Sequence, residues 1–267
     1  MGTTIAILSQ KGGTGKTTMA RTLTDVFGRL GLDVLAVDAD PQGNLSDYFD
    51  TDHDASPTLA DVLNGQVRAA EAVHGRVIPA NMRLAEAELA LAGKIGREVT
   101  LRSALRDLKR EKDMILIDCP PTLGLLTVNA LVAADHAILS TEAQYFSLQG
   151  VEQAVQVLDL ARDSLNPELD LLAVVLNIVN MRTKHARQTL DALRERFGDV
   201  VCRTVIRQSI AYAESAERAI PILEYRPDRG ADYLSLAGEL LRRLSRQDLL
   251  EPLDELSVEF VPAGART

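Results

Sequence analysis

The chain has 267 residues, of which 46% are apolar and 25% are charged, and its formal net charge is -9 at pH 7. This composition excludes an intrinsically disordered chain, and the length suits one large domain or a domain with an appendage. A run of about 18 apolar residues is missing and an apolar strand is predicted from residue 3 onward, so we expect neither a membrane-spanning segment nor a signal peptide, and we expect the protein in the cytoplasm.

Short apolar runs alternate with longer helical patterns along the chain. The predicted strands are Thr3–Leu8, Val34–Val37, Met114–Ile117, Ala137–Ser140, Leu172–Leu176 and a shorter one near Val200–Thr204. The predicted helices are near Lys16–Leu30, Leu84–Lys109, Gly124–Ala133, Leu148–Ser164, His185–Phe197 and Ala231–Leu244. This alternation is typical of strands joined by right-handed helical crossovers. We therefore predict an α/β fold, a mostly parallel sheet with helices on both faces.

The domain organisation is predicted to be simple. No internal repeat, low-complexity segment or Pro/Gly/Ser-rich linker divides the sequence. We expect one domain over residues 1–246 and a peripheral tail over residues 247–267. Cys119 and Cys202 lie far apart and neither belongs to a CxxC pair, which argues against a disulfide framework and against a zinc or iron–sulfur site.

The segment Gln10–Thr18 reads QKGGTGKTT, follows the first predicted strand and opens the first predicted helix, which is the structural context of a phosphate-binding P-loop. Its glycines let successive backbone N–H groups face a phosphate, and the positive end of the following helix adds its dipole. We expect Lys16 to reach the β- and γ-phosphates and Thr17 to coordinate Mg²⁺ through its hydroxyl. The other ATP contacts expected in the loop are Gly12, Gly13, Thr14, Gly15 and Thr18.

A second lysine, Lys11, stands at the start of this loop. The run from Lys11 to Thr17 matches KGGxGKT, and here the sequence resembles the deviant Walker A ATPases of the ParA/MinD family. The resemblance implies a P-loop NTPase fold, hydrolysis of ATP with Mg²⁺, and an ATP-sandwiched homodimer. In that dimer Lys11 reaches the nucleotide of the other subunit, so Lys11 joins Lys16 among the expected catalytic and ATP-binding residues. A solvated surface lysine is the alternative for Lys11.

The second predicted strand is followed by DADPQGN, from Asp38 to Asn44, which resembles the switch I motif of ParA-type partition ATPases. Carboxylates at the carboxyl end of a parallel strand face the crevice where ligands of open α/β sheets bind. The resemblance implies that Asp40 orients or activates the attacking water and that Asp38 helps to organise the metal site. Asp40 then belongs to the expected catalytic residues, and a turn-capping role is its alternative.

The third predicted strand ends in an acid, Asp118, in the run MILIDCPP, which is the Walker B arrangement. Asp118 is therefore expected to hold Mg²⁺ through a water. The segment that follows, Thr122–Ala130, resembles the switch II segment of the same family. The order of P-loop, switch I and Walker B makes this assignment stronger than any one of the motifs does.

Three later segments extend the resemblance over most of the chain. Glu142–Gly150 resembles a family stretch that packs beside the active site and the dimer face. Asn177 ends its predicted strand where relatives contact adenine, and a carboxamide can donate to and accept from that base. A loop-capping role is the alternative for Asn177. Ile222–Tyr233 resembles the last conserved block of the family, and we assign no catalytic or binding role to its residues.

A basic segment runs from Arg182 to Arg207, with seven cations and three acids in an acidic chain. Such a segment is what non-specific binding to DNA phosphates requires, and a solvated helix face with its own ion pairs is the alternative. One departure from the family lies beside it, because Ala211 stands where relatives carry the second arginine of a PRNVR segment. This part of the sequence is more similar to the small ParA types without an N-terminal helix-turn-helix domain. The candidate DNA contacts are Arg182, Lys184, Arg187, Arg203 and Arg207.

These observations predict an ATP-dependent switch. The resemblance implies that ATP and Mg²⁺ join two protomers, that the dimer binds nucleoid DNA non-specifically, and that a ParB-like or analogous adaptor stimulates an ATPase that is weak alone. Such a cycle segregates a plasmid or chromosome or positions a large protein assembly. A MinD-like membrane-associated regulator is the second reading, although the acidic C-terminus lacks a basic amphipathic helix. A metabolic P-loop enzyme is the third.

Overall fold

The computed structural model describes residues 1–52, 54–144 and 147–260. Six strands form one parallel sheet in the order β3-β2-β4-β1-β5-β6. The expected α/β fold with a parallel sheet is thereby confirmed. The strand bounds are β1 Thr3–Leu8, β2 Val34–Asp38, β3 Val77–Ile78, β4 Met114–Asp118, β5 His136–Glu142 and β6 Asp170–Asn177.

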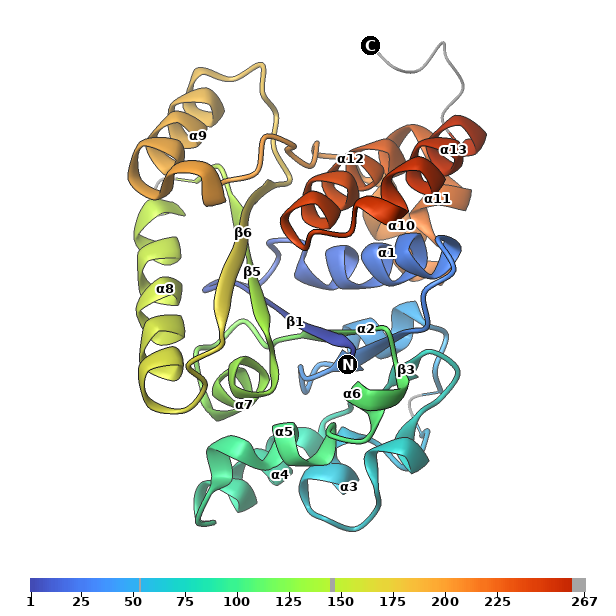
Figure 1. Cartoon of the computed structure of the whole chain (residues 1–267), viewed down its shortest axis with the longest axis vertical. Coiled ribbons are helices and arrows are strands. Elements are labelled where there is room, and N and C mark those ends of the chain that lie inside the picture. The colour runs from blue at the N-terminus through green and yellow to red at the C-terminus, as the bar shows by residue number, and fades with distance from the viewer. Residues whose placement is uncertain (53, 145–146, 261–267) are drawn as a thin grey trace.

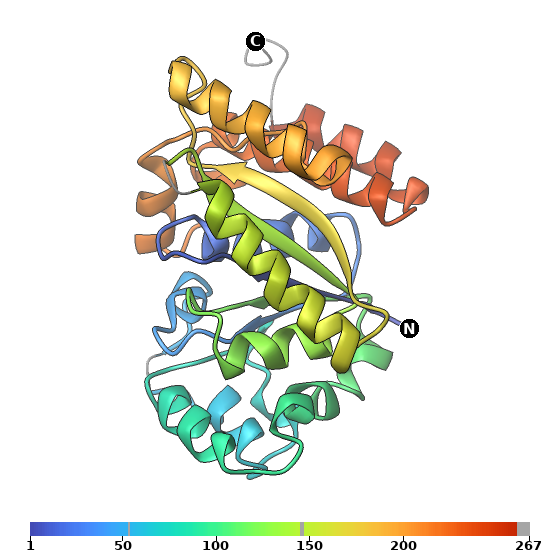
Figure 2. The ribbon, with the colours of Figure 1, turned by 90° about the vertical axis from the view of Figure 1, so that its left-hand side faces the viewer.

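Helices cover both faces of the sheet (Figure 1). One layer contains α1 Lys16–Arg29, α10 Ala211–Glu217, α11 Ile222–Tyr225, α12 Pro227–Arg243 and α13 Leu250–Phe260. The other contains α3 Leu59–Leu63, α4 Arg83–Ala92, α5 Thr100–Ala104, α6 Leu108–Glu111, α7 Leu125–Ala133, α8 Ser147–Ser164 and α9 Lys184–Phe197. Figure 2 shows α8 lying across β5 and β6. The short helix α2, Asn44–Tyr48, follows β2. The 3₁₀ turns of the described residues are η1 Ala69–Ala72, η2 Arg97–Val99, η3 Gly198–Val200 and η4 Gln247–Leu249.

Strand alternation divides the apolar side chains between two cores. In β1, Ile5 and Ile7 belong to the core under α1 and α12, whereas Ala6 and Leu8 belong to the core under α7 and α8. Successive side chains of a strand point to opposite faces, and a parallel sheet buries both faces. This double burial explains why the central strands are continuous apolar runs.

Two sequence predictions are wrong in detail. The helix predicted over Leu84–Lys109 is divided into α4, η2, α5 and α6, because the chain turns at Gly93 and Gly96, and Gly96 has a left-handed φ of 70°. The strand predicted near Val200–Thr204 is no strand of the sheet. Among the described residues, this region makes only an isolated bridge from Val201 to Val174 of β6.

The C-terminal residues add to the core next to α12. Leu249, Leu253 and Leu256 are buried in the same cluster as the apolar face of α12. The last part of the expected tail, residues 261–267, lies outside the described residues. No helix in the described part of the chain is long and apolar enough to cross a membrane.

Candidate functional site

The loops that follow β1, β2, β4 and β6 line one cleft of about 650 Å³. The register of the sheet pairs Asp38 at the end of β2 with Asp118 at the end of β4. Most of the expected site residues line this cleft, namely Gly12, Gly13, Gly15, Lys16, Thr17, Thr18, Asp40 and Asn177. Thr14 lines a separate, smaller cavity. A ligand cleft outside the carboxyl ends of parallel strands is the arrangement expected of open α/β sheets.

The P-loop backbone is shaped for an anion. Gly13 and Gly15 have left-handed φ values of 79° and 77°, and Gly15 caps α1 without a side chain. The first N–H groups of α1 therefore have no side-chain cap, which suits a phosphate at the positive end of the helix. Lys16 is only 6% exposed, and its Nζ donates to Ser9 Oγ over 3.0 Å. Thr14 is tied to β5, because Ser140 Oγ donates to its carbonyl oxygen over 2.7 Å.

Thr17 and Asp118 meet at the expected metal position. Thr17 Oγ1 donates to Asp118 Oδ2 over 2.6 Å, while Asp118 Oδ1 is buried without a hydrogen-bond partner among the described residues. Burial, and then the neighbouring carboxylate of Asp38, raise the pKa of Asp118 to about 8. A buried, unpartnered carboxylate oxygen beside a hydroxyl is a donor set that fits Mg²⁺. The described residues offer no group of three or more His, Cys, Asp or Glu arranged to hold a metal, so phosphate oxygens and waters have to complete its shell.

Asp38 is fully buried, and both of its carboxylate oxygens are bonded within the protein. Oδ1 accepts from the Asp40 N–H over 3.1 Å, and Oδ2 accepts from the Ser46 N–H and Oγ over 2.9 and 2.7 Å. Burial raises the pKa of Asp38 to about 6, against the lowering effect of these hydrogen bonds. The structure therefore places Asp38 beside Asp118, where it organises the loop after β2.

Asp40 has features of both roles that the sequence left as alternatives, the catalytic role and the turn-capping role. Its Oδ1 accepts from the Gln42 N–H over 3.0 Å, and its carbonyl oxygen accepts from the Gly43 N–H over 3.0 Å, which makes a tight turn. The same residue lines the cleft together with Lys16 and Thr17. Asp40 is thus both a turn residue and a residue of the cleft.

Lys11 lies outside this cleft. It is exposed, and its Nζ is 3.5 Å from Gln144 Oε1 in the segment after β5. Both residues line a smaller cavity of about 60 Å³ with Ser147 and Gly150. In the expected stretch Glu142–Gly150, Tyr145 and Phe146 lie outside the described residues.

Asn177 joins β6 to the P-loop. Its Nδ2 donates to the Gly15 carbonyl oxygen over 3.4 Å and to Ser140 Oγ over 3.3 Å, and its Oδ1 accepts from the Ile178 N–H over 2.9 Å. A Cβ added to Gly15 would lie 2.6 Å from Asn177 Nδ2. Asn177 thus lines the cleft and also caps its own loop.

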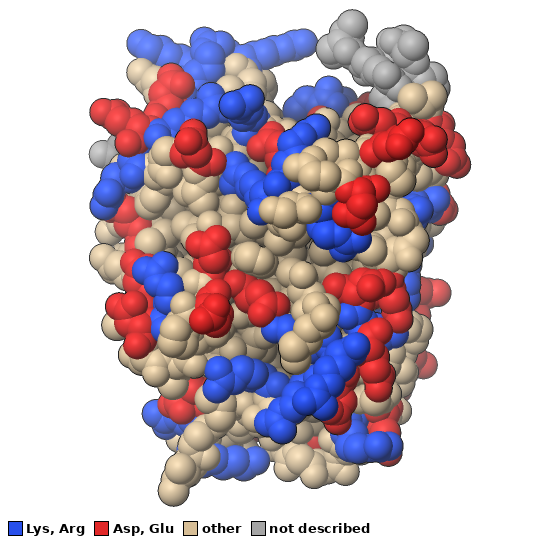
Figure 3. Space-filling view, in the orientation of Figure 1, with Lys and Arg blue, Asp and Glu red and all other residues tan. Residues whose placement is uncertain are grey.

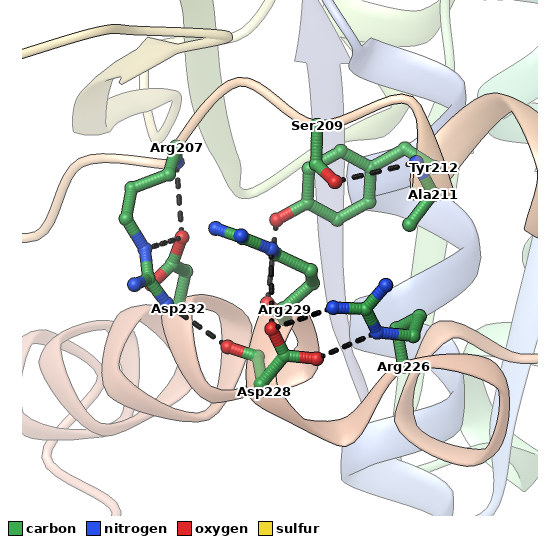
Figure 4. A network of polar contacts seen from close by, with 8 residues as sticks. All are labelled: Arg207, Ser209, Ala211, Tyr212, Arg226, Asp228, Arg229 and Asp232. Atoms are coloured by element: carbon green, nitrogen blue, oxygen red, sulfur yellow. Dashed lines mark hydrogen bonds and ion pairs between the residues drawn. The ribbon is translucent and has the colours of Figure 1, made fainter. Parts of the chain in front are cut away.

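Sequence reasoning missed the side of the cleft formed by the start of α10. Ser209, Tyr212 and Ala213 line it, and Tyr48 and Tyr233 lie beside them. Tyr212 packs edge-on against Tyr233, with ring centroids 5.8 Å apart, and its hydroxyl donates to the Arg229 carbonyl oxygen over 3.3 Å (Figure 4). In the sequence, this segment differs from the family at Ala211, but no sequence pattern predicts that it lines the nucleotide cleft.

The five candidate DNA contacts lie in different surroundings. Arg182, Lys184 and Arg187 are exposed at the start of α9, and Arg203 is exposed after η3. The guanidinium group of Arg207 is bonded to both carboxylate oxygens of Asp232 and to the Asp228 carbonyl oxygen (Figure 4). The Arg207 side chain is therefore held by α12, whereas the charged side-chain groups of the other four make no ion pair among the described residues. The backbone N–H of Arg203 donates to Glu239 Oε2 over 2.9 Å.

A second cleft, of about 1200 Å³, lies between α9 and the pair α12 and α13. Arg194, Arg203 and Arg242 line it, are exposed, and have no ion-pair partner in the described part of the chain. Arg242 was missed because it lies outside the basic sequence segment. Figure 3 shows Lys and Arg gathered at the end of the molecule that carries α9, and acidic side chains over α13.

A family model described as an AAA domain matches residues 2–171. The sporulation initiation inhibitor protein Soj of Bacillus subtilis is 38% identical over 249 residues, which are 90% of this chain and 98% of Soj. The chromosome partitioning protein ParA of Myxococcus xanthus is 35% identical over 252 residues, which are 91% of this chain and 89% of that protein.

Two solved structures are similar to this chain over most of its length. The cobyrinic acid a,c-diamide synthase of Mycobacterium smegmatis with bound ADP and magnesium is 30% identical, with a TM-score of 0.80 over 92% of this chain and 96% of that one. The septum site-determining protein MinD of Pyrococcus horikoshii with Mg-ADP is 29% identical, with a TM-score of 0.75 over 90% and 96%. These relatives hold a magnesium nucleotide, which the donor set of the cleft also fits.

Proposed function

The chain belongs to the ParA/MinD-type P-loop ATPases, and from this premise we propose that it is a dimerising switch that binds DNA non-specifically and positions a cargo. ATP joins two protomers in this cycle, and an adaptor protein stimulates hydrolysis and resets them. The cargo is a plasmid, a chromosome or a large protein assembly. The observation that carries the proposal is the cleft lined by Lys16 and Thr17 of the P-loop and by Asp40, with Asp118 bonded to Thr17.

The residues of the cleft divide the chemistry between them. The N–H groups after Gly13 and Gly15 and the ammonium group of Lys16 bind the phosphates. Thr17 and Asp118 hold Mg²⁺, which supplies positive charge against the phosphate oxygens. Asp40 orients the attacking water from its turn. Phosphoryl transfer depends mainly on positioning and charge neutralisation, and these groups provide both.

Dimerisation places Lys11 in the site of the partner. Its position outside the cleft of its own protomer supports this role, because its exposed side chain lies beside Gln144 in the segment after β5 rather than beside Lys16 and Thr17.

DNA binding is assigned to the surface around α9. Arg182, Lys184, Arg187 and Arg203 are exposed, and their charged side-chain groups make no ion pair among the described residues. Arg194 and Arg242 extend this surface along the second cleft. Exposed guanidinium and ammonium groups with few aromatic side chains suit contacts to phosphates that read no bases.

Two other functions are less well supported. A MinD-like membrane role needs a basic amphipathic helix, but α13 carries Glu251, Asp254, Glu255 and Glu259 and contains no lysine or arginine. Amide synthesis is named for the Mycobacterium smegmatis neighbour, but Soj and ParA share more identical residues with this chain. Partition or positioning is therefore the function we propose.

The test is the binding of two unrelated DNA duplexes by the purified protein with ATP, ADP or no nucleotide. Asp40→Ala holds the ATP state, Arg203→Glu and Arg187→Glu reverse charge on the proposed surface, and Arg110→Glu on α6 is the matched control far from α9. If about four phosphates are neutralised, the log–log salt slope is roughly -3.6. Both surface variants should weaken binding to both duplexes, and Arg110→Glu should not.

Three outcomes contradict the proposal. ATP-driven dimerisation without DNA binding at low salt removes the DNA step, and sedimentation with anionic liposomes then tests the membrane role. Equal losses in Arg203→Glu and Arg110→Glu would mean that only net charge matters. ATP turnover that requires a small-molecule amide acceptor points to the synthase class.

A further inference from the structure

Helix α7 begins without a side-chain cap of its own. Its N-cap is Gly124, and the missing acceptor comes from α4, because the Leu126 N–H donates to Glu88 Oε1 over 3.3 Å. A Cβ added to Gly124 would lie 3.2 Å from the same oxygen. The Glu88 carboxylate therefore rests against the first turn of α7, where free N–H groups and the helix dipole favour negative charge.

The start of α7 is also the end of the segment that leaves the metal position. This segment begins at Asp118, which is bonded to Thr17, and passes Pro121, which lines the nucleotide cleft. The Pro121 Cβ lies 3.9 Å from the place that a Cβ on Gly12 would occupy. One end of the segment is thus fixed at the metal position and the other end at Glu88.

The chain just before α4 contacts the loop after β2. The Ala80 N–H donates to Ser46 Oγ over 2.9 Å, and this hydroxyl in turn donates to Asp38. A Cβ on Gly43 would lie 2.9 Å from the Ala80 carbonyl oxygen, so the two backbones are in close contact. Gln42 Nε2 reaches Met82 Sδ at 3.8 Å. Residues 80–88 therefore connect the two segments that face the nucleotide.

This connection is held in place from outside the cleft. Arg83 binds both carboxylate oxygens of Asp61 on α3, over 2.6 and 3.3 Å. Leu84, Ala87 and Leu91 bury the inner face of α4. The helix α4 is thus anchored on α3, and the contacts at Ala80 and at Glu88 belong to one anchored segment.

We propose that Glu88 is a positioning residue for ATP hydrolysis, which fixes the start of α7 relative to the loop after β2. This inference rests on the ATPase function proposed above. Glu88 lies outside the residues that line the nucleotide cleft, so it acts through Leu126 and Gly124. Its removal leaves ATP binding intact and lets the Asp118–Gly124 segment move away from the position that hydrolysis requires.

The experiment compares Glu88→Ala, Glu88→Gln, Glu86→Ala and Arg83→Ala in the full-length protein. Glu86→Ala removes an exposed carboxylate from the same helix, and Arg83→Ala loosens α4 without touching α7. In Glu88→Ala we expect kcat to fall at least about threefold while KM for ATP stays within about twofold. Glu88→Gln, which keeps an acceptor oxygen, should recover most of kcat, and Glu86→Ala should match wild type.

Hydrogen exchange supplies a readout that does not depend on turnover. Binding of a non-hydrolysable ATP analogue with Mg²⁺ should protect residues 122–130 in wild type and Glu88→Gln, and Glu88→Ala should lose at least about half of this protection. Wild-type kcat in Glu88→Ala, equal losses in Glu88→Ala and Glu88→Gln, or a kcat loss in Glu86→Ala equal to that in Glu88→Ala overturns the inference. Arg83→Ala, which weakens the anchor of α4 on α3, should change kcat in the same direction as Glu88→Ala. If wild type hydrolyses no ATP, the proposed function fails, and the exchange data still decide whether Glu88 positions α7.

Discussion

The hydroxyl of Thr17 donates to Asp118 Oδ2 over 2.6 Å and leaves Asp118 Oδ1 buried without a partner among the described residues. This pair joins the first turn of α1 to the end of β4 across 101 positions of sequence. An unpartnered carboxylate in a buried site costs free energy unless it holds a proton or a cation. A cation bound at this position would offset that cost once Asp118 has lost its proton.

The first prediction concerns pH. Burial raises the folded-state pKa of Asp118 to about 8 and that of Asp38 to about 6, both from 3.8. The folded state then keeps protons that the unfolded state releases, so stability falls as pH rises from about 4 to about 8 and levels off above that. Thermal unfolding of the Mg²⁺-free protein between pH 5 and pH 9 measures this slope.

Asp118→Asn should flatten that slope and weaken binding of Mg·ATP at least about tenfold. Asp254→Asn, at an exposed position of α13, is the control and should follow wild type. Because Mg²⁺ displaces the proton of Asp118, wild-type affinity should rise with pH up to about 8. A wild-type stability curve that rises over the same interval contradicts the assignment.

The second prediction concerns Gly15. Alanine there has to adopt a φ of 77°, and its Cβ would lie 2.6 Å from Asn177 Nδ2. We expect Gly15→Ala to cost about 1–3 kcal/mol of stability and to weaken ATP binding at least about tenfold. Gly93→Ala is the control, since Gly93 has a φ of -88° and open space around it. Denaturant unfolding and nucleotide titration measure both effects, and equal results for the two variants would contradict the prediction.

The elements that could be predicted from the sequence are those whose own residues determine them. The apolar runs of β1 and β4 are buried on both faces. The P-loop contains glycines, and glycine is the residue type that adopts the left-handed backbone conformation found there. The two-residue strand β3 had no such signal, because Val77 and Ile78 are extended through their pairing with Ala36 and Val37 of β2. The break between α4 and α5 was marked by Gly93 and Gly96, but the apolar periodicity outweighed them in the prediction.

The missed site residues depend on contacts between distant segments. Tyr212 lines the cleft only because α12 holds it, through Tyr233 and the Arg229 carbonyl oxygen. Arg242 and Arg203 line the same cleft because α12 lies beside the chain that leaves α9. Glu88 is an ordinary helix acid in sequence, and its cap on α7 follows from packing alone. Contacts between segments that lie far apart in the sequence are not indicated by any local sequence pattern.

The third prediction separates the two roles of Asp40. Asp40→Asn keeps an acceptor for the Gln42 N–H and so preserves the turn, whereas Asp40→Ala removes it. If the carboxylate orients water, both variants should lower ATP hydrolysis by about 10²-fold or more, with nucleotide affinity within about threefold of wild type. Single-turnover hydrolysis and nucleotide titration test this. Near-normal turnover in Asp40→Asn reduces Asp40 to a turn residue.

The fourth prediction tests whether α13 belongs to the folded domain. Leu253 is 4% exposed, and its Cδ2 lies 3.3 Å from the place of a Cβ on Gly238 of α12. Leu253→Ala should lower the free energy of unfolding by about 2–4 kcal/mol, through lost burial and the cavity left behind. Val258→Ala on the same helix, 61% exposed, should change it by no more than about 0.5 kcal/mol. Urea unfolding compares the two variants, and if Leu253→Ala costs as little as Val258→Ala, α13 contributes nothing to the core and the domain ends with α12.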